Sequence, residues 1–454
     1  MQVLLNKLII NGVKNINKPI ELLFSNKTIN ENIFSDNSKV KAIYGPNGSG
    51  ESGLISSLYI YKRLILDDNG LNNTFFSHFV YESINKDLNN MCIDIVFSIL
   101  NLLNDNKIYT FKHSFELKID RDSVIINKEN ISILKGRSIN DENFKPLITI
   151  ENGMLKYLEY VKENELINDT LYLNSLNLLN KYSILNVFHK LLSSNIYKDI
   201  KNSNILISLF SITIFSCNLV VELNKEDEHL EYINNKIFEI KYNDIDKLSE
   251  LIKVLLNNLP KYEYIFYLST YNKDVVLLND YDKYIENIKK LTNFIKIFKP
   301  DLDEILIDKK INDNKFYCDK LFKYNNKLIN IEFESTGIKK LVKLYSILKL
   351  CANGHIAFID EMDANLHDVY FTKLIEFFNN DSYGQLCFTT HNLEPIDILK
   401  NNSHTLDFLS NDSRIYSWIK DGNNSPLNKY INGLIPYSPF NVESFDFDLL
   451  LDEE

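Results

Sequence analysis

Apolar residues in the first 150 positions recur in short alternating or continuous runs, which is the pattern of β-strands. The pattern predicts strands over Val3–Ile10, Ile20–Phe24, Met91–Ile99, Ile108–Leu117 and Ser123–Leu134. In the run from 108 to 117, Tyr109, Phe111, His113 and Phe115 alternate with more polar neighbours. This alternation is typical of a half-buried antiparallel strand, so we interpret His113 as a sheet residue rather than a ligand.

The pattern changes near residue 151. From there to about residue 325, apolar residues occur at helical spacing, as at Leu248, Leu251, Ile252 and Leu255, which predicts a mostly helical insertion. The most apolar part, 205–220, contains several serines and is marginal in length. A buried helix or a pair of strands is therefore favoured there over a membrane span. Lysines between 289 and 299 favour a solvated helix face, with nucleic-acid contact as the alternative.

A glycine-rich loop separates a short apolar run from a run of helical period. Val40–Tyr44 predicts a buried strand and Leu54–Leu66 predicts a helix. Between them lie Gly45, Pro46, Asn47, Gly48, Ser49, Gly50, Glu51 and Ser52. In such a loop the glycines let backbone N–H groups surround a phosphate, the helix N-terminus adds partial positive charge, and Ser52 offers a hydroxyl to a metal ion.

Glu51 occupies the position where this motif has a lysine. An ammonium about 4 Å from a phosphate charge is worth roughly 4 kcal/mol at an effective dielectric constant near 20, and a carboxylate reverses the sign. Glu51 therefore either stays ionised and weakens nucleotide binding, or takes up a proton at a cost. We favour an engineered lysine-to-glutamate substitution that silences an ATPase. A naturally degenerate nucleotide site is the alternative.

A turn of small residues opens a second predicted helix. Ser335, Thr336 and Gly337 follow the strand-like run Leu328–Phe333 and precede a helix that extends to about Leu350. A helix opening of this kind presents unpaired N–H groups and a hydroxyl to an anion. The same residues are also ordinary helix caps, so they indicate an anion site only because of their position in the chain.

Two further strands end in side chains that are suited to phosphoryl transfer. The run Ile356–Glu361 ends in Asp360 and Glu361 and is followed by Asp363, and Leu386–Thr389 is followed by His391. We expect Asp360 to hold Mg²⁺ through water, Glu361 to polarise the attacking water, and His391 to hydrogen-bond the γ-phosphate.

Composition narrows the partners and the compartment. The chain has 454 residues, and 45% of them are hydrophobic, which is enough apolar material for two or three domains. Its net charge is −11. The acidic balance argues against a generally basic nucleic-acid surface, although DNA contact through a local patch stays possible. The five cysteines form no CxxC pair, so reduced thiols are expected rather than zinc ligands or disulfides. We expect no membrane partner and a cytoplasmic location, since neither a signal peptide nor a membrane span is predicted.

Taken together, these motifs resemble the ABC-type ATPases of the AAA15 group, which are related to the overcoming-lysogenisation-defect ATPases and, more distantly, to SMC and RecF proteins. The matching residues are Gly45–Gly50 and Ser52 for Walker A, Ser335–Gly337 for the signature, Ile359–Glu361 for Walker B, Asp363 for the D-loop and His391 for the switch.

The resemblance implies an α/β fold: an ABC-type P-loop ATPase head with mixed sheets, discontinuous and interrupted by the mostly helical insertion. Lobe I, 1–150, would carry Walker A and an antiparallel sheet, and lobe II, 326–430, would carry the signature, Walker B and the switch. The insertion, 151–325, and an acidic tail, 431–454, complete the expected division.

The resemblance also implies ATP and Mg²⁺ as cofactors and a head-to-tail homodimer, or a higher homo-oligomer. In that assembly two ATP molecules would be sandwiched between subunits, with Ser335 and Gly337 of one subunit completing the nucleotide site of the other. Asp363 would belong to the same composite site. The usual Q-loop glutamine is not found; Ser77 and His78 lie near its expected place.

Several relatives carry a further domain after the ATPase. The overcoming-lysogenisation-defect and Gabija ATPases have a TOPRIM nuclease there, which needs a sizeable extra segment, whereas about 60 residues follow His391 here. The resemblance therefore favours a stand-alone ATPase with a separate effector, as in Septu, PARIS and related abortive-infection systems. Such an ATPase would sense phage infection and control a toxic effector through ATP.

Two other functions remain open. One is a DNA-repair or DNA-clamping ATPase like RecF or SMC, and the other is a pseudo-ATPase scaffold. The acidic tail, which alternates phenylalanine with aspartate near its end, would pack on its own lobe or dock on a partner.

Overall fold

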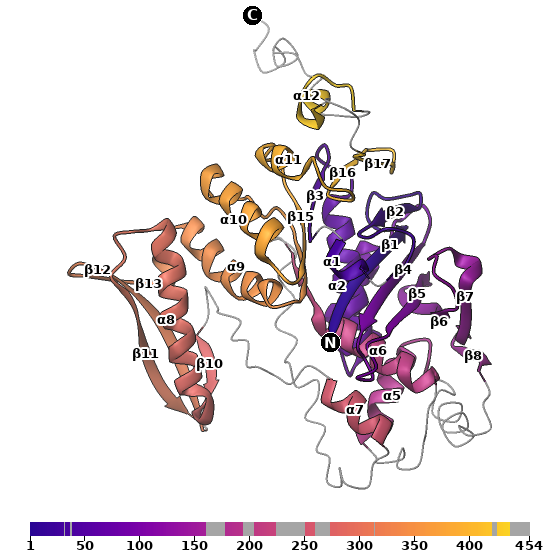
Figure 1. Cartoon of the computed structure of the whole chain (residues 1–454). Helices are drawn as coiled ribbons and strands as arrows, with labels where there is room; N and C mark the ends of the chain where they lie inside the picture. Colours follow the sequence, from indigo (N-terminus) through magenta and orange to yellow (C-terminus); the bar gives the residue numbers. More distant parts are fainter. Residues whose placement is uncertain are drawn as a thin grey trace, which may run out of the picture.

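The computed structural model describes residues 1–30, 32–36, 39–159, 178–193, 204–223, 250–258, 273–312, 314–419 and 425–435. In this part of the chain, three sheets organise the helices around them (Figure 1). The predicted acidic tail lies almost entirely outside the described residues. No described helix combines the length and the apolar character needed to cross a membrane.

The first sheet is antiparallel and has the strand order β2-β1-β4-β5-β6-β7-β8. Its strands are β1 (Gln2–Asn11), β2 (Ile20–Leu23), β4 (Asn90–Leu100), β5 (Ile108–Asp120), β6 (Ser123–Leu134), β7 (Phe144–Glu151) and β8 (Met154–Leu158). The five strands predicted from the alternating pattern are confirmed, with ends that differ by up to three residues. His113 is a fully buried sheet residue of β5, as predicted.

The second sheet carries the glycine-rich loop. Its order is β17-β16-β3-β15-β14-β9, and every neighbouring pair except β16 and β17 is parallel. The strands are β3 (Val40–Tyr44), β9 (Leu219–Glu222), β14 (Ile356–Ile359), β15 (Gln385–Thr389), β16 (Leu406–Leu409) and β17 (Ile415–Ser417). Strands β3, β14 and β15 are buried throughout because helices cover both faces of a parallel sheet.

Alternate residues of these strands enter two different cores. Ile43 and Phe358 pack with helices α2 (Glu51–Leu66), α5 (Ile184–Ser193) and α6 (Asn204–Asn218). Ala42 and Ile359 pack with α9 (Thr336–Ala352), α10 (Asp368–Asp381), α11 (Glu394–Leu399) and α12 (Pro426–Ile431) on the other face. The period of two along each strand thus places α2 and the signature helix α9 on opposite faces of one sheet.

The third sheet lies apart from the other two, with one helix along it (Figure 1). It consists of β10 (Asp274–Leu277), β11 (Glu304–Asn312), β12 (Lys315–Tyr324) and β13 (Lys327–Asn330), and α8 (Tyr281–Phe298) covers its buried face. This core includes Ile338 and Leu341 of α9. The third sheet is therefore joined to the head through the signature helix.

The segment 151–325, predicted as a mostly helical insertion, contains strands as well as helices where the structure describes it. Its described part contains helices α5, α6, α7 (Glu250–Asn258) and α8, but also strands β8 to β12. Strand β9 belongs to the central sheet and begins directly after α6. The sequence pattern did not predict β9 because no glycine or proline separates this strand from the apolar helix before it. It did not predict β11 because the charged residues Asp308 to Lys310 interrupt the alternation of apolar and polar positions. The apolar run 205–220 is a buried helix that passes into this strand.

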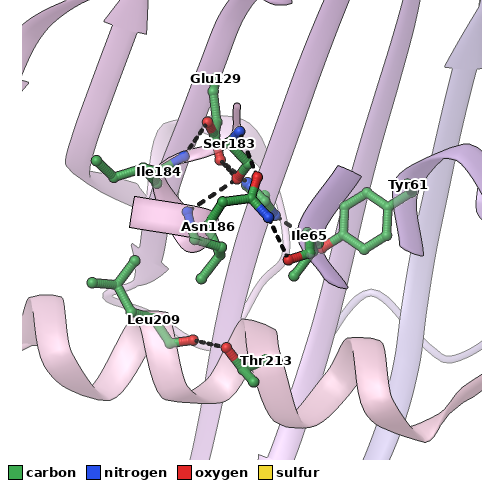
Figure 2. A network of polar contacts seen from close by, with 10 residues as sticks. Tyr61, Ile65, Glu129, Ser183, Ile184, Asn186, Leu209 and Thr213 are labelled. Atoms are coloured by element: carbon green, nitrogen blue, oxygen red, sulfur yellow. Dashed lines mark hydrogen bonds and ion pairs between the residues drawn. The ribbon is translucent and has the colours of Figure 1, made fainter. Parts of the chain in front are cut away.

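A buried polar network joins the loop helix α2 to strands β5 and β6 and to the start of helix α5 (Figure 2). Glu129 of β6 accepts hydrogen bonds from Ser183 Oγ, at 2.5 Å, and from Ile184 N, at 3.0 Å, and lies 3.1 Å from His113 Nε2. His113 Nδ1 lies 2.9 Å from the hydroxyl of Tyr61 on α2. Satisfied networks of this kind fix the relative positions of the elements that they join.

Two further α-helices in the described part of the chain are α1 (Ile33–Asp36) and α3 (Thr74–Ser83). All five cysteines are free, and three of them are buried.

Candidate nucleotide site

The glycine-rich loop runs from the end of β3 to the first residue of α2, so strand, loop and helix stand in the predicted order. Gly48 and Gly50 have φ values of 83° and 107°, which favour glycine. A Cβ at Gly50 would lie 2.5 Å from Ile16 Cγ1. Asn15 Nδ2 donates to Gly48 O at 2.9 Å, and Ser49 N donates to Pro46 O at 3.0 Å. The loop is thus held in a bent form with glycine-specific backbone angles.

Glu51 begins α2 rather than preceding it, and Ser52 follows in the same turn. Burial and the nearby carboxylates of Asp360, Glu361 and Asp363 raise the pKa of Glu51 to about 8, although a backbone hydrogen bond from Gly45 opposes the shift. The Oε1 atom of Glu51 is buried without a hydrogen-bond partner among the described residues. Of the two protonation states open to Glu51, the neutral one is the state that the structure favours near neutral pH.

Asp360 and Glu361 follow β14 directly, beside the end of β15. Thr389 Oγ1 donates to Asp360 Oδ1 at 2.7 Å and accepts the backbone N–H of Glu361 at 2.7 Å. Glu361 has a left-handed φ of 44°, which is uncommon outside glycine and is found where the surrounding structure enforces it. One threonine therefore fixes both residues of the predicted Walker B pair.

The second carboxylate oxygen of Asp360 is available to a ligand. Asp360 is 1% exposed, and its Oδ2 atom is buried without a hydrogen-bond partner among the described residues. Mg²⁺ keeps several waters and takes one or two protein oxygens together with phosphate oxygens. The carboxylate of Asp360 and the hydroxyl of Ser52 would supply protein oxygens of that kind. Among the described residues, no cluster of three His, Cys, Asp or Glu side chains is suited to a metal.

The register of the central sheet brings these pieces to one edge. Phe388 pairs with Ile359, and Thr389 pairs with Ile43, so β3, β15 and β14 end side by side. The loop, Thr389 and Asp360 consequently lie next to each other at the carboxyl ends of parallel strands, where ligands bind in open α/β sheets.

The predicted signature caps α9 and packs against the turn after Walker B. Ser335 is exposed, and its Oγ accepts from Ile338 N at 3.4 Å. Thr336 Oγ1 donates to Asn365 Oδ1 at 3.4 Å, and a Cβ at Gly337 would lie 2.8 Å from Asn365 O. Asp363 O accepts from Leu366 N within the same turn, at 3.0 Å. Signature and D-loop residues of one chain therefore form a single surface.

His391 lies two residues beyond β15 and is exposed. Its neighbour Thr390 donates its backbone N–H to Ile43 O at 3.3 Å, which places this loop beside the end of β3. Ser77 and His78 lie on α3. The chain has two glutamines, Gln2 and Gln385, and Gln385 is engaged with the backbone of Leu5, so the Q-loop role stays open.

Three residues near the site were not singled out from the sequence. Thr389 holds the Walker B pair, and Glu222 of β9 accepts the backbone N–H of Asp360 through its carbonyl at 3.0 Å. Burial lowers the pKa of Lys340 on α9, although the carboxylates of Glu222, Asp360, Glu361 and Asp363 oppose this shift. A threonine at a strand end and a lysine one turn into a helix are too common to signal such roles by themselves.

Comparison with known proteins gives one family and a set of structures. The family described as "AAA domain, putative AbiEii toxin, Type IV TA system" matches residues 40–397. No curated protein matches the chain.

SMC heads are among the solved structures that resemble the chain. They include an SMC head bound to the C-terminal winged-helix domain of ScpA, with 14% identity, TM-score 0.43, and coverage of 91% of this chain and 97% of that chain. An SMC head from Pyrococcus furiosus, bound to the C-terminal domain of ScpA, has 14% identity, TM-score 0.40, and coverage of 95% and 98%. The SMC head domain from Thermotoga maritima has 14% identity, TM-score 0.33, and coverage of 92% and 100%.

Proposed function

Because the chain belongs to this family of AAA domains, whose description refers to a type IV toxin–antitoxin system, we propose that it is an ABC-type ATPase of abortive infection. In this proposal it responds to phage infection and controls a separate toxic effector through ATP binding and hydrolysis. Glu51 keeps the present chain poor at hydrolysis.

One observation carries the ATPase assignment. The end of β3, from which the phosphate-binding loop continues, lies beside the ends of β15 and β14, where Thr389 contacts both Asp360 and Glu361. In this assignment Asp360 and Ser52 hold Mg²⁺, which neutralises phosphate charge when bound. Glu361 orients the attacking water as a base, and His391 hydrogen-bonds the γ-phosphate.

The proposal also includes a homodimer with composite nucleotide sites. Ser335 is exposed at the start of a 17-residue helix, and the contacts of Thr336 and Gly337 with Asn365 join the signature to the D-loop in one surface. Helix N-termini of this kind attract phosphate. A second copy of the chain would present its phosphate-binding loop to this surface.

Restoring the lysine tests the ATPase. We expect Glu51→Lys to raise ATP hydrolysis at least about tenfold over the present chain, because an attractive charge replaces a group that repels phosphate when ionised. Glu361→Gln in the Glu51→Lys background should abolish the gain, measured as phosphate release. If Glu51→Lys hydrolyses no ATP, the assignment is wrong, and DNA-dependent hydrolysis by this variant would favour the DNA-clamping alternative.

Co-purification tests control of an effector. The chain and its Glu51→Lys variant would each be expressed with their neighbouring genes and purified in ATP and Mg²⁺. We expect a partner protein to bind the two forms to different extents, because ATP-bound and free states present different surfaces. Equal recovery with both forms would contradict nucleotide control, and the absence of any partner would contradict a separate effector.

A further inference from the structure

Lys340 lies on the face of α9 that is turned toward the central sheet. Positions 336, 340, 343 and 347 share one stripe of a helix, since they are four, three and four residues apart. Ile347 packs in the core beneath this sheet, and Thr336 bonds to Asn365 in the turn after Walker B. The residue between these contacts therefore faces the ends of the sheet strands.

A second contact fixes the other side of Lys340. Lys343 Nζ pairs with Glu222 Oε1 at 3.1 Å. The backbone carbonyl of the same Glu222 accepts the N–H of Asp360 at 3.0 Å. Along α9, Lys340 therefore lies between Thr336, which contacts Asn365, and Lys343, which contacts Glu222.

The electrostatic surroundings agree with this placement. The side chain of Lys340 is half-buried, and four carboxylates, those of Glu222, Asp360, Glu361 and Asp363, act on its ammonium. Three of these carboxylates, all except Glu222, also act on Glu51. A polyphosphate would enter a site that is rich in carboxylates and lacks the loop lysine.

We propose that Lys340 is the compensating positive charge of this nucleotide site. It is a positioning residue that acts through the carboxylates at the ends of β9 and β14, and by offsetting their charge it lets a magnesium–nucleoside triphosphate bind beside Glu51. This inference rests on the proposed function of the site. It assigns the role to the signature helix, on the face of the sheet opposite α2.

Nucleotide binding by the full-length chain tests the proposal, with magnesium–ATP titrated calorimetrically. We expect Lys340→Met to weaken binding about tenfold, because the positive charge that offsets the carboxylates of the site is lost. Lys340→Arg should stay within about threefold of the parent chain because it retains the charge. Lys339→Met is the matched control: Lys339 precedes it on α9 and donates to Glu332 O at 2.6 Å, so binding should change less than about twofold.

The Glu51→Lys background separates charge compensation from a structural role. We expect the loss caused by Lys340→Met to fall to about threefold or less there, because the lysine introduced into the loop supplies its own attraction. An equal loss in both backgrounds would overturn the proposal, as would unchanged binding in Lys340→Met or no binding by the parent chain. Failure of Glu51→Lys itself to bind nucleotide would instead refute the proposed function. Thermal unfolding of each variant shows whether it is folded.

Discussion

Glu51 shows how one residue changes a site without changing its framework. The phosphate-binding loop keeps its positive φ values at Gly48 and Gly50, and α2 begins at Glu51. An acidic side chain in the first turn of a helix is itself favourable, because it complements the helix dipole. The unfavourable part is burial, which together with the nearby carboxylates of Asp360, Glu361 and Asp363 raises the pKa of Glu51 to about 8.

This shift predicts a pH-dependent stability. The folded chain keeps a proton on Glu51 that the unfolded chain releases above pH 4.5. The contribution of Glu51 to the free energy of unfolding therefore falls as the pH rises from about 4.5 to 8. Glu51→Gln should match the parent at pH 4.5 and be more stable at pH 9. At about 1.4 kcal/mol per pKa unit, the gain is at most about 5 kcal/mol, and less because the side chain is partly exposed.

Urea unfolding at both pH values measures this difference. Glu142→Gln is the control, since Glu142 is exposed and begins no helix of the site. An equal effect of Glu51→Gln at pH 4.5 and pH 9 would contradict the assignment of the raised pKa.

At the scale of elements, the contacts between α2, β5, β6 and α5 decide how the head is assembled. The network around Glu129 crosses all four elements and is buried (Figure 2). It joins the helix that follows the phosphate-binding loop to both the antiparallel sheet and the segment after residue 178. Movement of α2 on nucleotide binding would therefore carry these elements with it.

Removal of single hydroxyl groups tests the network. Tyr61→Phe removes the partner of His113 Nδ1 and should destabilise the chain by about 1–2 kcal/mol, the usual cost of a buried polar group left without its bond. Tyr109→Phe is the matched control on β5, because its hydroxyl donates to Asp105 at 2.6 Å in a half-buried position. Its effect in urea unfolding should be less than half that of Tyr61→Phe. Equal effects would mean that the network contributes no special stability.

The elements also show what the sequence could and could not predict. The alternating pattern located β4, β5 and β6, and the glycine loop located β3 and α2, because local sequence decides these features. Strand β9 was missed because a Leu-Val-Val-Glu run after an apolar helix has no local boundary. Its place beside β14 depends on long-range pairing, and so does the approach of Glu222 and Lys340 to Asp360. Contacts of this kind leave no periodic signal in one sequence.

For the whole molecule, the division of the site between opposite faces of one sheet is the main consequence of the fold. α2 packs on one face and α9 on the other, while the ends of β3, β15 and β14 lie between them. The signature helix also anchors the third sheet through Ile338 and Leu341. Any nucleotide that draws α9 toward a second copy would therefore move the third sheet as well.

ATP-dependent assembly provides the test at this scale. We expect the double variant Glu51→Lys, Glu361→Gln to bind ATP without hydrolysing it and to form a stable dimer, since the bound nucleotide is trapped between the two copies. Light scattering after size-exclusion chromatography should show about a twofold increase in mass with ATP and Mg²⁺ and none without nucleotide.

Ser335→Arg, added to that double variant, should abolish the dimer because a bulky side chain replaces the small exposed cap of α9 at the composite site. Ser425→Arg is its matched control, since Ser425 caps α12 through the same kind of bond, from Asn428 N at 3.5 Å. Both changes remove a helix cap worth about 1 kcal/mol, so a general loss of stability would affect them alike. Loss of the dimer with Ser335→Arg alone would place the signature at the interface, whereas persistence of the dimer in both variants would show that the subunits meet elsewhere.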